Sequence, residues 1–159
     1  MNKASLIKKI VASLRESFAV LEKAARASHA EATHESSKAE NKYDTRGLEA
    51  AYLASGQARQ AKEFLDSIKI YEGLKPVSFS PDTPIDLTAL VELDVGAMCS
   101  YYFIGPRNGG LEIEHRKGEI TVITPQSPLG QRLMGKRAGD QWTEKLSGST
   151  VKYRIESAS

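Results

Sequence analysis

The chain has 159 residues, which is enough for one ordinary domain or two small ones. Apolar residues make up 40% and aromatic residues 7%, which suits a protein in which part of the chain forms an elongated element with little core. The net charge of +2 gives no bulk electrostatic argument for nucleic-acid binding, and a single cysteine, Cys99, excludes an internal disulfide. The sequence shows neither a signal peptide nor an apolar run of about 18 residues. We therefore expect a soluble, cytoplasmic protein that spans no membrane.

Residues 1–75 are predicted to form an antiparallel α-helical coiled-coil hairpin. Apolar or small residues recur in alternating steps of three and four, the pattern of a coiled-coil seam. In the first helix these positions are Ile7, Val11, Leu14, Phe18, Leu21, Ala25, Ser28 and Ala32, and in the second they are Ala51, Ala54, Ala58, Ala61, Leu65 and Ile68. No proline precedes Pro76, so neither helix is interrupted. The larger seam residues lie near the two chain ends of the hairpin, which predicts a slim, polar tip.

The predicted tip, near residues 35–49, is rich in charge. Glu40 and Asp44 are four residues apart, so they share a face if the segment is helical. Two carboxylates this close repel each other, and a divalent cation relieves the repulsion. Mg²⁺ accepts such oxygen ligands when water or a partner completes its shell. The alternative interpretation is an ordinary solvated surface in which Lys38, Lys42 and Arg46 form ion pairs with the acids.

The rest of the chain is predicted to be a linker over residues 76–88 and a small α+β domain over residues 89–159. The linker carries three prolines. Short runs rich in β-branched and aromatic residues predict strands at 89–95, 99–105, 119–124 and 150–156. Between the last two, Ser127-Pro128 predicts the start of a short helix that ends at Gly135. We expect these strands to form a twisted antiparallel sheet.

No catalytic constellation is evident in this second part. The three histidines, His29, His34 and His115, lack the spacing of a zinc site, and no phosphate-binding or nucleophile motif is present. Cys99 lies within a strand pattern, which favours a buried structural thiol over a nucleophile. Trp142 is expected to be a core or sheet residue. The protein is therefore not expected to be an enzyme in its own right.

Residues 119–140, EITVITPQSPLGQRLMGKRAGD, combine a predicted strand, a Ser-Pro helix start, an apolar helix and a Gly-Lys turn. Residues 100–106, SYYFIGP, form a predicted strand that leads into a glycine. With the N-terminal coiled coil, these two segments make the chain resemble the bacterial Gre-type transcript-cleavage factors, which are GreA/GreB-like transcription elongation factors. The resemblance extends over essentially the whole chain, but it is specific only in the last 60 residues or so.

This resemblance implies an FKBP-like C-terminal domain that docks on bacterial RNA polymerase at the rim of the secondary channel. The coiled coil would then reach down the channel toward the active site. We expect the polymerase docking contact at Pro128, Arg132, Gly135, Lys136, Arg137 and Asp140. For the three cations among them, a solvated helix end is the alternative interpretation.

In the family the tip reads Asp-Leu-x-Glu-Asn, and its two acids help to hold a second Mg²⁺ in the polymerase's own site. Residues 37–41 here read Ser-Lys-Ala-Glu-Asn, so Glu40 and Asn41 match but Ser37 replaces the aspartate. We expect Asp44 to supply the missing carboxylate, so that Glu40 and Asp44 act as the catalytic, metal-holding pair only in complex with polymerase. Supporting roles at the tip are expected for Glu35, Asn41, Tyr43 and Glu49. The tyrosine that follows the acids in the family corresponds to Tyr43 or Tyr52.

Three functions remain open at this stage. The first is promotion of RNA cleavage in backtracked complexes, with no cofactor of its own and with Mg²⁺ supplied by the polymerase active site. The second is a non-cleaving Gre-like or Rnk-like regulator that binds polymerase and competes for the channel. The third, a prolyl isomerase or chaperone, rests on the FKBP-like fold alone, and fold does not carry function. In the first two, RNA polymerase is the partner of a monomeric protein, and nascent RNA and DNA are met only through the elongation complex.

Overall fold

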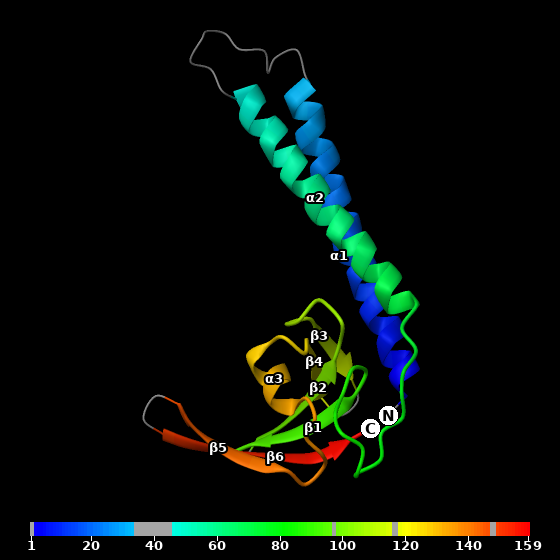
Figure 1. Ribbon diagram of the computed structural model, residues 1–159. Coiled ribbons are helices and arrows are strands. Elements are labelled where there is room, and N and C mark those ends of the chain that lie inside the picture. Colours follow the sequence, from blue (N-terminus) through cyan, green and yellow to red (C-terminus); the bar gives the residue numbers. More distant parts are fainter. Residues whose placement is uncertain (1, 34–45, 97, 116–117, 147–148) are drawn as a thin grey trace. The chain divides into compact units, whose positions relative to one another are not determined.

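The computed structural model describes residues 2–33, 46–96, 98–115, 118–146 and 149–159 (Figure 1). Two long helices, α1 (Lys3–Thr33) and α2 (Arg46–Glu72), come first. The chain divides into two compact units, one of Val11–Glu72 and one that joins Met1–Ile10 to Gly73–Ser159. Helix α1 therefore contributes its first turns to the same unit as the sheet.

The sheet follows the helices and has six strands. They are β1 (Leu90–Val95), β2 (Met98–Ile104), β3 (Glu112–His115), β4 (Gly118–Ile123), β5 (Gln141–Leu146) and β6 (Ser149–Ala158), with α3 (Pro128–Leu133) between β4 and β5. Their order is β3-β4-β2-β1-β6-β5, and every pair is antiparallel except β2 with β4. The predicted α+β class is confirmed. Strands β3 and β5 were not predicted: β3 has only four residues, and β5 begins at Gln141, inside the segment 127–142 that was interpreted as the helix and its end.

In the unit formed by residues 11–72, the contact between α1 and α2 differs in part from the predicted seam. Leu14, Ala54, Ala61 and Ile68 are buried as expected. Ala51 and Ala58 are exposed, however, and Leu65 is 40% exposed. Tyr71 is fully buried and Phe64 half-buried in their place. The seam of α2 is therefore rotated toward its aromatic side chains, which remove more apolar area from water than alanine does.

One face of the sheet packs against α3. Its core contains apolar residues from the strands, from α3 and from the segment before β1, namely Ile85, Ala89, Val91, Leu93, Ile104, Ile123, Leu133, Ile155 and Ala158. Residues of the other face, such as Phe103 and Ile120, are also buried. The first turns of α1 join this unit: Lys9 Nζ donates to the Glu114 carbonyl at 2.8 Å, and Lys3 lies over the Phe79 ring at 4.7 Å.

The predicted linker ends inside the folded domain. The Ile85 amide donates to the Lys136 carbonyl at 2.7 Å, and the Gly135 amide donates back to the Ile85 carbonyl at 2.9 Å. The Ile85 side chain is 1% exposed. Thr88, at a φ of 71°, donates its amide to the Ile104 carbonyl at 2.8 Å. These bonds tie the end of the proline-containing segment both to the turn after α3 and to the sheet.

Candidate tip and docking sites

Most of the predicted tip residues lie outside the described part of the chain. This holds for Glu35, Glu40, Asn41, Tyr43 and Asp44, which fall within residues 34–45. Glu49 is described, and it lies exposed in the first turn of α2. Within the described residues, no group of three or more His, Cys, Asp or Glu side chains is placed to hold a metal ion. The metal role of the tip acids therefore stays a prediction.

The start of α3 is determined locally by Ser127, Pro128 and Gly130. Ser127 is the N-cap: its Oγ accepts a hydrogen bond from the Gly130 amide at 3.1 Å and donates one to the Thr124 carbonyl at 2.8 Å. Pro128 occupies the first helical position, where a missing N–H costs nothing. Gly130 is buried against Thr124, and a Cβ there would overlap the Thr124 carbonyl oxygen. The Ser-Pro motif thus fixes both the position and the direction of α3.

The predicted docking residues lie on α3 and the turn after it. Pro128 is exposed on the first turn of the helix. Gly135 is exposed and has a φ of 79°, which suits glycine because this backbone region disfavours a Cβ. Asp140 Oδ2 accepts the Arg137 amide at 2.8 Å, so this carboxylate closes the turn that the two residues span.

The three cations of the predicted docking site each have a partner in the same domain. Arg132 forms an ion pair with Glu144 on β5. The Lys136 ammonium lies over the Trp142 ring, 5.4 Å from its centroid. Arg137 Nε donates to the Asp82 carbonyl at 2.8 Å. The partners of these cations come from β5 and from the segment before β1, so the spacing of residues in the sequence could not predict the contacts.

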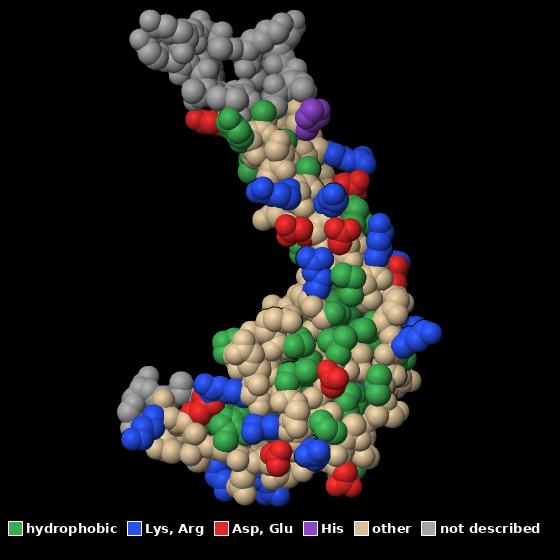
Figure 2. Space-filling view, in the orientation of Figure 1, with side chains coloured by type: hydrophobic (Ala, Val, Ile, Leu, Met, Phe, Trp, Pro, Cys, Tyr) green, Lys and Arg blue, Asp and Glu red, His purple; other side chains and the backbone are tan. Residues whose placement is uncertain are grey.

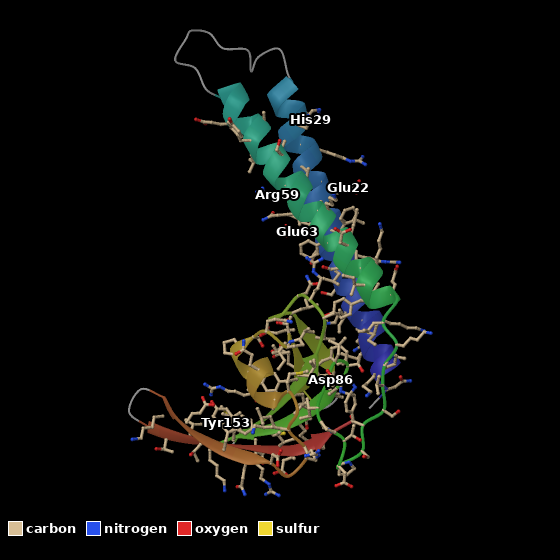
Figure 3. The ribbon with its side chains drawn as sticks, in the orientation of Figure 1. Glu22, His29, Arg59, Glu63, Asp86 and Tyr153 are labelled. Atoms are coloured by element: carbon tan, nitrogen blue, oxygen red, sulfur yellow. The ribbon has the colours of Figure 1, made fainter. Side chains whose placement is uncertain are left out.

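An aromatic pair that was not predicted to belong to a site includes the ring beneath the Lys136 ammonium. Trp142 on β5 and Tyr153 on β6 are cross-strand neighbours, and their rings stack with centroids 4.9 Å apart and planes 4° from parallel. Figure 3 labels Tyr153 on β6. Trp142 Nε1 donates to Glu144 Oε1 at 2.8 Å, so Glu144 holds both the indole and Arg132. Trp142 and Glu144 are two residues apart, which places them on the same face of a strand. This spacing could have indicated the pair only if β5 had been predicted.

A second polar cluster surrounds Glu92 on β1. Its carboxylate accepts hydrogen bonds from the Tyr101 hydroxyl at 3.2 Å, the Ser157 hydroxyl at 3.1 Å and the Cys99 thiol at 3.5 Å. Cys99 is exposed, so the expectation of a buried thiol is wrong: it lies near the start of β2, before the strand enters the core. Desolvation, reinforced by Glu92 and Asp94, raises the pKa of the Cys99 thiol, which disfavours the reactive thiolate. The hydrogen bond with Cys99, together with desolvation and Glu92, raises the pKa of Tyr101 to about 12.

Comparison with known proteins bears directly on the domain that carries α3. Residues 83–159 match the family model described as transcription elongation factor, GreA/GreB, C-terminal. This C-terminal domain belongs to the GreA/GreB family. The family resemblance inferred from residues 100–106 and 119–140 is thereby confirmed for the C-terminal domain. No curated protein matches the sequence significantly.

The solved structures that match the chain have related names, but their sequence identities and TM-scores are low. GreA factor homolog 1 (Gfh1) of Thermus thermophilus is 18% identical, with 94% of each chain covered and a TM-score of 0.36. Gfh1 of Thermus aquaticus is 20% identical, covering 98% of this chain and 92% of that one, at a TM-score of 0.36. A GreA/GreB factor from Nitrosomonas europaea is 19% identical over 60% of this chain and 78% of its own, also at 0.36. At such TM-scores these matches carry no argument, and the assignment rests on the family model.

No helix in the described part of the GreA/GreB-like chain is both long enough and apolar enough to cross a membrane.

Proposed function

We propose that this protein is an elongation factor that binds bacterial RNA polymerase at its secondary channel. The C-terminal domain docks on the enzyme, and the α1–α2 hairpin carries the tip toward the active site. The single observation that supports this most strongly is the match of residues 83–159 to the GreA/GreB C-terminal domain. The protein acts as a monomer in the bacterial cytoplasm. It is not an enzyme itself, because the chemistry belongs to the polymerase.

At the tip, Glu40 and Asp44 supply the carboxylates of the proposed reaction, with Glu35 as a further candidate. Metal ions in the polymerase site stabilise the attacking water and the leaving oxygen during RNA cleavage. The contribution of this chain is negative charge and oxygen ligands, which Mg²⁺ prefers. Spacing by four residues brings the two carboxylates to one face if the segment is helical.

Transcript cleavage in a stalled, backtracked elongation complex tests this proposal. With the wild-type protein and Mg²⁺ at near-neutral pH, we expect shortened RNA that can be re-extended. Replacing Glu40 and Asp44 by Ala is expected to slow cleavage by about a hundredfold, the scale of losing a group that stabilises transition-state charge. The matched control replaces Glu16 and Glu63, two exposed carboxylates of the hairpin helices, and should cleave at the wild-type rate. Equal rates for both double variants would refute the tip role.

A second candidate function is a regulator that occupies the channel without promoting cleavage. Ser37 favours it, because a serine hydroxyl cannot replace the charge of the aspartate that the family carries at this position. In this case the protein should compete with a cleavage-competent Gre factor for polymerase and leave the RNA at full length. Ser37→Asp should then confer cleavage. Failure of that variant to cleave while it still binds polymerase would show that Ser37 is not the cause.

A further inference from the structure

Three cationic side chains are held in place by three different contacts at the end of α3. The partners are a carboxylate for Arg132, an aromatic ring for Lys136 and a backbone carbonyl for Arg137. Long cationic side chains normally lose rotamer entropy when a partner binds them. Because these three are already oriented, that cost is largely met before binding, which favours affinity.

The contacts that orient the cations leave them able to bind more. An ammonium over an aromatic ring uses none of its three N–H donors on that ring, so Lys136 keeps them for hydrogen bonds. The Asp82 carbonyl accepts from the Nε of Arg137, which leaves the donors of the two terminal guanidinium nitrogens for a partner. Arg132 is paired but its side chain remains 47% exposed. The hydrogen-bond donors that remain available on this surface therefore belong to cationic side chains.

The surroundings favour a protein partner over a nucleic acid. The nearby acids Glu144 and Asp140 are bound to groups of this surface and lower its net charge, whereas phosphate backbones select strongly basic surfaces. Half-buried Leu129 and Met134 pack against the same core cluster as the aromatic pair and contribute apolar area. Aromatic residues, Met and Arg together characterise the central part of protein interfaces. In the space-filling view, side chains of both charges lie close together over the β5–β6 end of the domain (Figure 2).

We propose that Arg132, Lys136 and Arg137, positioned by Glu144, Trp142 and Asp82, form a docking surface that recognises carboxylates on its protein partner. This inference rests on the proposed function, in which that partner is RNA polymerase, and it adds the chemistry of the contact. The cations bind acidic side chains of the polymerase. Trp142 does not carry the specificity but acts as the platform that orients Lys136.

The test is a binding titration of the full-length protein with purified bacterial core RNA polymerase at two salt concentrations. One variant carries Lys136→Glu and Arg137→Glu. The matched control carries Lys145→Glu and Lys152→Glu, which make the same change in charge on the opposite face of β5 and β6. We expect the first pair to raise the dissociation constant about tenfold or more and to weaken its salt dependence, while the control stays within about twofold of wild type. Lys136→Arg, which keeps the charge over Trp142, should bind like wild type.

The outcomes separate this inference from the proposed function. Equal binding by both charge-reversed pairs, with wild type bound, overturns the docking surface and leaves polymerase binding in place. Absence of wild-type binding overturns both. Binding of a labelled RNA oligonucleotide that is tighter than polymerase binding and is lost in the Lys136→Glu, Arg137→Glu variant would assign the surface to nucleic acid instead. Thermal unfolding followed by Trp142 fluorescence verifies that each variant is folded.

Discussion

Gly130 offers a sharp test of how the Ser-Pro motif builds α3. A Cβ added there would overlap the Thr124 carbonyl oxygen and would lie 2.9 Å from Ser127 Oγ. That oxygen cannot move freely, because it accepts the Ser127 amide at 3.0 Å and the Ser127 hydroxyl at 2.8 Å. Gly130→Ala must therefore disturb the backbone, the N-cap or both. We expect the whole start of α3 to shift.

The expected cost follows from two contributions. Overpacking a buried site costs about 1–3 kcal/mol, and loss of a helix N-cap costs about 1 kcal/mol. Together they predict that Gly130→Ala lowers the free energy of unfolding of the C-terminal domain by about 2–4 kcal/mol. For a domain of this size, this corresponds to a fall of about 10 °C or more in Tm.

The matched control is Gly56→Ala in the interior of α2. A Cβ at Gly56 meets nothing within 4 Å, so the same substitution should stabilise the hairpin by about 0.5–1 kcal/mol through helix propensity. Thermal unfolding is followed by the fluorescence of Trp142, the single tryptophan, for the sheet domain and by far-UV circular dichroism for the helices. If Gly130→Ala unfolds within about 2 °C of wild type, the steric reasoning is wrong.

Three further predictions concern the seam, the Glu92 cluster and the helix cap. Ile68→Ala, at 6% exposure, should cost about 2–5 kcal/mol of hairpin stability in urea unfolding, whereas Leu65→Ala should cost about 1 kcal/mol; equal losses would contradict the rotated seam. Because the pKa of Tyr101 is raised to about 12 in the folded state, its contribution to stability is complete below pH about 10 and disappears as the pH rises toward 12. Cys99→Ala should lower this pKa in an ultraviolet titration of the tyrosines. An unchanged pKa would refute the hydrogen bond with Cys99 as the cause. Ser127→Ala should lower the free energy of unfolding by about 1 kcal/mol, and an unchanged urea midpoint would mean that the cap is dispensable.

Much of the C-terminal domain was predictable because its signals are local. Ser127-Pro128 marks a helix start through capping and a fixed φ, and the helix forms at that position. The runs at 89–95 and 119–124 alternate or cluster apolar residues in the way that strands require, and both are strands. Strand β3, with four residues, is too short for such a pattern to emerge.

The candidate docking site was predictable in its residues but not in its contacts. Arg132, Lys136 and Arg137 follow one another on α3 and its turn, so the sequence brings them close. Their partners Glu144 and Trp142 come from β5, and only strand pairing determines that these side chains face α3. The tip acids remain predictions, since residues 34–45 lie outside the described part of the chain.

The sequence by itself determined the two long helices, the change to a sheet after Gly73 and the family of the C-terminal domain. These features depend on periodicity, prolines and capping, which act over a few residues. The tertiary structure alone decided which face of α2 forms the seam, because alanine at 51 and 58 and leucine at 65 keep the same period as the aromatic stripe of Phe64 and Tyr71. Periodicity predicts that apolar residues repeat along α2, but it does not predict which of two neighbouring apolar stripes is buried. That choice follows from the larger apolar area that aromatic side chains remove from water when they are buried.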